Sequence, residues 1–237
     1  MTEYDRADLT YMLKKVQIGD VASEASNELK LEEGTNRINS LGLMLTHDTR
    51  DNVYNPTRGL LGVAACDYAG GFLGGDKNFL RYTFGSSIFF TVFGDNVLEL
   101  RDKVGAIDDF DTTDRIPIYE RFFAGGANTI RGYKERKIGP RDPITQDPVG
   151  GKSILLGTAE YTVPVIKVLK AAAFFDTGNV WPTVGEFGLD DLKSSVGTGL
   201  RIKTPLGPVK LDYGYPLDSV AGEKKRPRFH FSMTRGF

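Results

Sequence analysis

The chain has 237 residues, 40% of them apolar, and its 30 Lys and Arg balance 31 Asp and Glu to a formal net charge of −1. This balance excludes the strongly basic composition of a typical nucleic-acid-binding domain, so no nucleic-acid partner is expected. The single Cys66 excludes an internal disulfide, and the lack of any run of 18 apolar residues excludes a transmembrane helix.

Apolar and polar residues alternate with period two along most of the chain, which predicts β-strands. Ten strands are predicted, at about 6–18, 38–50, 59–70, 78–93, 96–107, 152–165, 168–180, 194–204, 208–217 and 228–237. Short turn signals separate most of them, such as NPTRG at 55–59. One long connection remains, at about 108–151. The predicted fold class is therefore all-β.

The last predicted strand, RFHFSMTRGF, shows the alternation best. Its apolar face carries Phe229, Phe231, Met233 and Phe237, and its opposite face carries His230, Ser232, Thr234 and Gly236. In a soluble sandwich the apolar face is the core, whereas in a membrane barrel it faces lipid around a polar lumen. Because both architectures share this period, alternation alone leaves the two alternatives open.

The sequence contains no complete motif for catalysis or metal binding. The glycine-rich stretch at 70–77 lacks the spacing of a phosphate-binding loop, because Asp76 separates the glycine from the lysine. The acidic run at 108–114 lacks the glycine and the closing Glu of a calcium-binding loop. His47 and His230 lie on different predicted strands. We therefore expect no enzyme, no cofactor and no metal site.

One buried electrostatic arrangement is predicted. Glu160 and Asp176 fall on the polar faces of neighbouring strands, where two adjacent carboxylates require a cation. Arg131, in the long connection just before these strands, offers a planar group that bonds carboxylates through two donors at once. Gly132 permits a tight turn, and Tyr133 offers a ring to pack on the wall. The alternative is that Arg131 is an ordinary solvated loop residue.

The stretch FFAGGANTIRGY at 122–133 resembles the outer-membrane assembly-factor superfamily, to which BamA and TamA belong. Its tetrad is Ile130, Arg131, Gly132 and Tyr133. Further similar segments are DTRD at 48–51 with Pro56 and Gly59 after it, FDTGNVW at 175–181, GLRIKTPLGPV at 199–209, and the terminal aromatic Phe237.

The resemblance implies an antiparallel transmembrane β-barrel in the bacterial outer membrane, with a long loop folded toward the lumen. It implies that Arg131 meets Glu160 and Asp176, and that Phe237 completes a terminal signal read by the assembly machinery. The implied function is insertion of barrel proteins into the outer membrane, by templating substrate strands on an exposed sheet edge. Its partners would be the lipid bilayer and unfolded outer-membrane proteins or accessory assembly proteins. A polypeptide-secretion pore is the family's other activity.

The chain also departs from the family pattern, which implies sixteen strands and periplasmic POTRA modules. We expect residues 1–237 to form one transmembrane β-barrel domain of about ten strands, corresponding to the C-terminal part of such a barrel and without POTRA modules. Three arrangements would satisfy its edge strands: a self-closed small barrel, a homodimer paired through open edges, or a piece of a longer protein. We favour the self-closed barrel, with Arg131 at its mouth or outside if the lumen is too narrow.

Two further alternatives to an insertase stay open. One is a structural barrel fragment without insertase activity, and the other is a soluble all-β binding module, which the absence of a signal peptide pattern at the N-terminus favours.

Overall fold

A computed structural model describes residues 3–110, 115–204, 207–220 and 222–233. Ten strands form a single antiparallel sheet in which each strand pairs with its neighbours in the sequence. The strands are β1 (Asp5–Ile18), β2 (Gly34–Asp48), β3 (Gly59–Ala69), β4 (Phe79–Thr91), β5 (Val97–Asp108), β6 (Ser153–Ile166), β7 (Leu169–Trp181), β8 (Lys193–Thr204), β9 (Gly207–Pro216) and β10 (Arg228–Met233). The predicted all-β, up-and-down fold and its ten strands are confirmed.

The helical content is small and lies in the connections. A four-residue helix α1 (Asn27–Lys30) and two 3-10 turns, η1 (Gly71–Leu73) and η2 (Ile118–Glu120), complete the secondary structure. No helix in the described part of the chain is long and apolar enough to cross a membrane.

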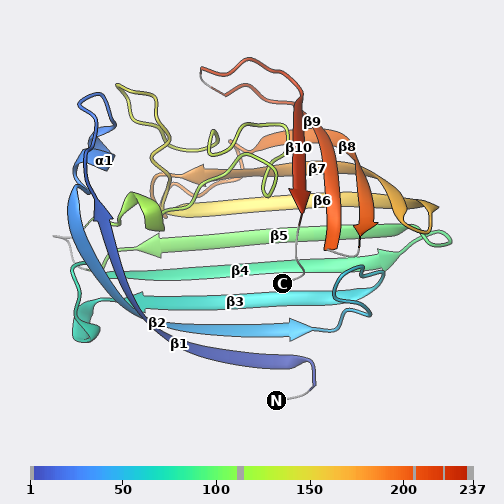
Figure 1. The fold of residues 1–237 in the computed structure, drawn as a ribbon, viewed down its shortest axis with the longest axis horizontal. Coiled ribbons are helices and arrows are strands. Elements are labelled where there is room, and N and C mark those ends of the chain that lie inside the picture. The colour runs from blue at the N-terminus through green and yellow to red at the C-terminus, as the bar shows by residue number, and fades with distance from the viewer. Residues whose placement is uncertain (1–2, 111–114, 205–206, 221, 234–237) are drawn as a thin grey trace.

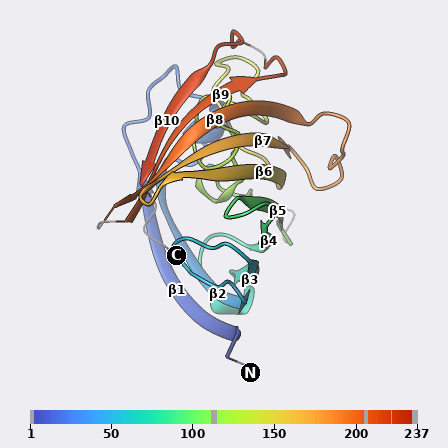
Figure 2. The ribbon, with the colours of Figure 1, turned by 90° about the vertical axis from the view of Figure 1, so that its right-hand side faces the viewer.

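The sheet curls strongly, and the described residues of the long connection 109–152 between β5 and β6 lie on its concave side (Figures 1 and 2). Among the described residues β1 pairs only with β2, and β10 pairs only with β9. The expectation that ten strands close on themselves is therefore wrong for this part of the chain. Closure requires that strand number, stagger and the volume of the interior agree, and the buried cluster of the connection takes up part of that interior.

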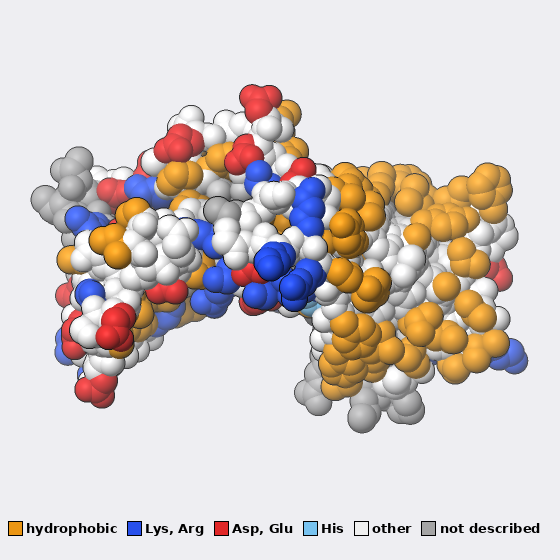
Figure 3. Space-filling view, turned by 90° about the horizontal axis from the view of Figure 1, so that it is seen from above, with side chains coloured by type: hydrophobic (Ala, Val, Ile, Leu, Met, Phe, Trp, Pro, Cys, Tyr) orange, Lys and Arg blue, Asp and Glu red, His pale blue; other side chains and the backbone are white. Residues whose placement is uncertain are grey.

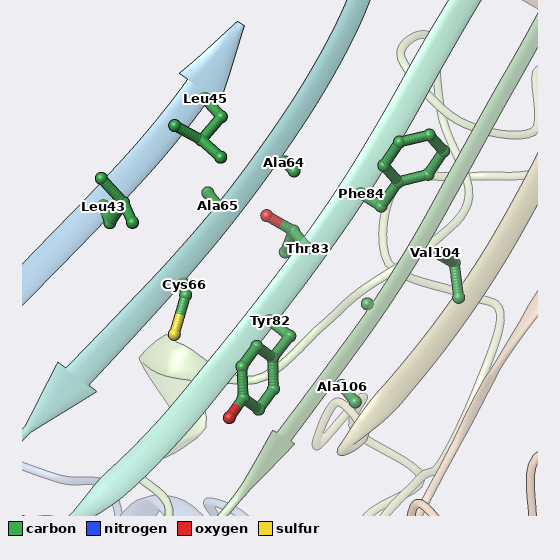
Figure 4. A pocket seen from close by; sticks show the side chains of 11 residues that line it. Leu43, Leu45, Ala64, Ala65, Cys66, Tyr82, Thr83, Phe84, Val104 and Ala106 are labelled. Carbon is green, nitrogen blue, oxygen red and sulfur yellow. The ribbon is translucent and has the colours of Figure 1, made fainter. Parts of the chain in front are cut away.

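The convex face of the sheet is apolar and exposed. Outward-pointing Leu9, Leu13, Phe229 and Phe231 are each more than 60% exposed. On β2 to β5, Leu43, Leu45, Tyr82 and Phe84 surround a shallow apolar hollow over small side chains that include Ala64 and Cys66 (Figure 4). Seen from above, orange apolar side chains cover one half of the molecule (Figure 3). A polar concave face with an apolar convex face is the arrangement of a membrane barrel and the inverse of a soluble sandwich.

The two ends of the sheet differ in the length of their connections. The turns at 92–96 and 167–168 lie at one end, and the long connections 109–152 and 182–192 lie at the other. Outer-membrane barrels have short periplasmic turns and longer extracellular loops. The end that carries the connection 109–152 is therefore the extracellular end.

A hydrophobic cluster joins this connection to the wall of the sheet. Ile130 and Ile107 are completely buried, and Phe122, Ile154 and Val180 are at most 3% exposed. Short bridges between Phe122 and Gly151 and between Ala124 and Ile138 fold the connection back on itself. The inner part of the connection is thus packed as a core and not displayed as a free loop.

Candidate functional site: the ion network around Arg131

Arg131 lies inside the curled sheet, 5% exposed, between β6 and β7. Its Nε and Nη2 donate to the two carboxylate oxygens of Asp176 at 2.8 and 2.7 Å, and its backbone N–H donates to Asp176 Oδ2 at 3.1 Å. Its Nη1 donates to Glu160 Oε2 at 2.7 Å. The guanidinium carbon also lies 3.4 Å from the centroid of the Phe174 ring. These contacts place Arg131 within the wall's polar face, away from the mouth and from solvent.

Sequence reasoning missed a second arginine in the same network. Arg201 on β8 donates through Nε and Nη2 to both oxygens of Glu160 at 2.7 Å, and through Nη1 to Asp212 Oδ1 at 2.6 Å. Asp212 Oδ2 lies 3.5 Å from Arg131 Nη1. Two arginines therefore share three carboxylates across β6 to β9. The available signal was the inward parity of Arg201 and Asp212 on their strands.

Glycine is required at position 132 by close packing. Its N–H donates to Ser195 Oγ at 3.1 Å. A Cβ added there would lie 2.5 Å from the Ser195 Cβ and 2.8 Å from the Pro216 nitrogen. Gly214 on β9 is equally close, since a Cβ there would lie 2.7 Å from the Arg131 carbonyl oxygen. The two glycines let the backbone of the connection lie directly on the wall.

Tyr133 fixes the outer end of the tetrad. Its hydroxyl lies 3.0 Å from the Ser194 carbonyl oxygen and 3.1 Å from that of Asp218, and it accepts from the Asp218 N–H at 3.2 Å. Burial raises the pKa of Tyr133 to about 12, so the hydroxyl stays protonated and can donate at neutral pH. The tetrad thus bonds β8 and the start of the β9–β10 connection.

His230 on β10 also reaches the tetrad and was not singled out from the sequence as a site residue. Its Nε2 lies 2.6 Å from the Arg131 carbonyl oxygen. An N–H at Nε2 is present in the imidazolium and in one neutral tautomer, so this hydrogen bond does not need a charged histidine. The last strand is therefore tied to the same loop residue that β6 and β7 hold. Phe237, the predicted terminal signal, lies outside the described residues, and its role stays a prediction.

Within the described residues, no group of three or more His, Cys, Asp or Glu side chains is arranged to hold a metal ion. The network's carboxylates are all engaged by arginine.

A curled antiparallel sheet with an apolar convex face, a polar concave face and a loop bonded inside it defines an outer-membrane β-barrel protein. The model of the Omp85 superfamily domain matches residues 1–237, and the chain belongs to that superfamily.

Among curated proteins, an outer membrane protein assembly factor BamA of Nitratidesulfovibrio vulgaris is 34% identical over 240 residues, which cover 99% of this chain and 30% of that protein. The BamA of Neorickettsia risticii is 33% identical over 228 residues, 92% of this chain and 30% of that protein. A SAM50-like protein of Schizosaccharomyces pombe is 26% identical over 236 residues, 93% of this chain and 49% of that protein. The chain thus spans about a third of the BamA relatives and about half of the SAM50-like one.

Among solved structures, BamA from Haemophilus ducreyi lacking POTRA domains 1–3 superposes with a TM-score of 0.79 at 18% identity, over 97% of this chain and 51% of that one. At this identity the match concerns the fold alone. It agrees with the outer-membrane barrel class, and the chain is an integral outer-membrane protein by family and fold.

Proposed function

We propose that this chain is the part of an outer-membrane assembly factor that carries the lumen loop, and that it assists the insertion of unfolded barrel proteins into the outer membrane. The observation that carries the proposal is the buried bonding of the tetrad Ile130–Tyr133 to the wall through Arg131, Glu160 and Asp176. Membership of a superfamily whose relatives are named assembly factors supports it.

The geometry suits this role because it couples three parts of the molecule at one residue. Arg131 joins β6 and β7 through its side chain and β10 through its carbonyl oxygen. β10 is also an edge strand among the described residues, with unpaired backbone groups on one side. An edge strand can accept an incoming strand by β-augmentation, and the network holds the wall and the loop in place while the edge is used.

The proposal is tested with the refolded chain in liposomes, by following the folding of a urea-unfolded outer-membrane barrel protein by its heat-modifiable gel mobility. We expect faster insertion than in empty liposomes of the same lipid. Insertion at the rate of empty liposomes would contradict the proposal and favour a structural barrel segment without insertase activity. Passage of an unfolded polypeptide into the liposome lumen, without its insertion, would favour a secretion pore instead.

A further inference from the structure

A basic cluster lies at the extracellular end, where the β9–β10 connection meets the loop segment after the tetrad. We call it the extracellular basic cluster, and it consists of Lys134, Lys137, Arg141, Lys224, Lys225, Arg226 and Arg228. Glu223 joins its two segments, with carboxylate oxygens 3.1 Å from Lys134 Nζ and 3.3 Å from Arg228 Nη2.

Further contacts connect Arg141 and Lys137 to the two segments. A Cβ added at Gly222 would lie 3.6 Å from Arg141 Nη1, so the two residues are close neighbours. Arg141 Nη2 donates to the Lys137 carbonyl oxygen at 2.9 Å. Lys134, Lys224, Lys225 and Arg228 line one small hollow. These contacts join the two segments, and Arg226 follows Lys224 and Lys225 directly in the sequence.

Three of the cluster's cations are uncompensated. Lys224, Lys225 and Arg226 are exposed, and within the described residues none of the three forms an ion pair. Lys225 Nζ donates only to the Leu217 carbonyl oxygen. Glu223 is shared between two cations, so it does not neutralise the surface. Like charges held this close repel one another unless an anion lies among them.

The cluster stands at the outer rim of the apolar face. Phe229, 66% exposed, points outward from β10, on the face opposite Arg228 and His230. Tyr215 near the end of β9 and Leu217 just after it are exposed apolar residues at the start of the β9–β10 connection. Figure 3 shows Lys and Arg side chains gathered where the orange apolar half of the molecule ends. A strand rises about 3.3 Å per residue, so cations a few residues beyond the apolar face lie at the depth of lipid headgroups.

Two other connections at the same end carry the opposite charge. The segment 19–33 contains Asp20, Glu24, Glu28, Glu32 and Glu33, and the segment 182–192 contains Glu186, Asp190 and Asp191. The exposed cations Lys224, Lys225 and Arg226 thus stand at an end where the connections 19–33 and 182–192 are acidic.

We propose that the extracellular basic cluster binds the phosphate groups of lipid headgroups in the outer leaflet, and so anchors the end of the sheet that contains the last strand. Lys and Arg side chains are long enough to keep their apolar stems along the rim while the charged ends reach phosphate oxygens. Clusters of cations beside a membrane-embedded surface bind anionic headgroups, each contributing a factor of about five in affinity. The inference rests on the membrane placement and not on the insertion activity.

The test is a titration of the full chain in neutral detergent micelles with phosphatidic acid, with phosphatidylcholine as the reference lipid. The cluster variant is Lys224→Gln/Lys225→Gln/Arg226→Gln. The control variant, Lys30→Gln/Lys167→Gln/Lys203→Gln, removes the same charge from three separated exposed lysines. Equal thermal melting of all three proteins shows that the fold is kept.

We expect the wild type and the control variant to bind phosphatidic acid at least tenfold more tightly than phosphatidylcholine, with affinity that falls as salt is added. The cluster variant should lose that preference to within about twofold. Wild-type affinity in the cluster variant, or an equal loss in the control variant, would overturn the proposal. Displacement of the lipid by millimolar inorganic phosphate would also overturn it, because the site would then be one for a soluble anion.

Discussion

At the scale of single residues, the network around Arg131 distributes its charge unevenly. Of the two arginines in the network, Arg131 alone pairs with Asp176, whereas both Arg131 and Arg201 pair with Glu160. Thr158 gives Asp176 one further hydrogen bond, at 3.0 Å. Removing Arg131 therefore leaves Asp176 as the main uncompensated group, a narrower defect than the two carboxylates that the sequence alone suggested.

Arg131→Ala should lower the free energy of unfolding by about 3 kcal/mol, at the lower end of the cost of breaking a buried pair. Glu160 keeps Arg201 in the variant, which limits the loss. The measurement is urea unfolding in detergent followed by heat-modifiable gel mobility. An unchanged unfolding midpoint would mean that the arginine is solvated in the membrane protein.

Gly132→Ala tests close packing without changing any charge. The new methyl group would collide with Ser195 and with the Pro216 backbone, and overpacking of this kind costs about 1–3 kcal/mol. Gly62→Ala on β3, where a Cβ meets nothing within 4 Å, is the matched control. Equal melting temperatures of the two variants would show that the loop does not lie on the wall.

At the scale of elements, β10 depends on the loop through His230. His230→Ala should speed amide hydrogen exchange in β10 and at the tetrad about fivefold, the effect of losing a hydrogen bond worth about 1 kcal/mol. His230→Gln keeps a donor and should retain protection. Ser232→Ala, inward on the same strand, serves as the control. Unchanged exchange at the tetrad in His230→Ala would contradict the coupling.

The β2–β3 turn has its own internal bonding. Asp51 accepts from the Thr57 N–H at 2.8 Å, from the Thr57 hydroxyl at 2.5 Å and from the Arg58 N–H at 3.3 Å. Burial acts to raise the pKa of Asp51, but these hydrogen bonds outweigh it and lower the pKa to about 2. The carboxylate's contribution to the turn is therefore complete above the ordinary pKa of about 3.9 and is lost as pH falls through about 2.

A titration of the Asp51 carboxyl carbon by NMR should thus show a midpoint near pH 2. A midpoint near pH 4 would mean that the turn is open in solution.

The elements themselves were well predicted from period-two alternation, because each strand separates a lipid-facing row from a polar row. The contacts of the connection 109–152 were harder to predict from the sequence, because the residues that it contacts lie far along the chain. Its partner carboxylates followed from the inward parity of Glu160 and Asp176 and from family resemblance. Arg201 and His230 did not follow, because alternation gives the face of a residue but not which inward side chains meet across a curved sheet.

At the scale of the whole molecule, the open edges are the feature that sequence reasoning described least well. Ten strands suggested closure, yet β1 and β10 are separate ends of the sheet in the described residues. The concave space holds the buried cluster of the connection. Unpaired edges in hydrocarbon are costly, so β1 and β10 should pair with further strands in the membrane, whether from a longer protein or a second copy.

Cysteine pairs that join two copies through β1 or β10 would reveal edge pairing in lipid. If the chain forms an edge-paired homodimer, disulfide cross-linking between outward positions such as Leu9 and Phe231 should yield dimers at low protein-to-lipid ratios. Purely monomeric products at every ratio would contradict pairing between copies.

The central claim, that the loop is held inside the barrel by Arg131 and the wall carboxylates, is tested most directly by a double-mutant cycle between Arg131→Ala and Asp176→Ala. The free energies of unfolding of the wild type, both single variants and the double variant are measured in the same detergent. The network predicts a coupling free energy of about 2 kcal/mol. Arg131→Ala leaves the buried Asp176 without a cation, and Asp176→Ala leaves the Arg131 guanidinium hydrogen-bonded to Glu160 alone, with Nε and Nη2 unbonded. The double variant removes both unbonded groups. Additive effects, with a coupling near zero, would contradict the ion pair and with it the anchored loop.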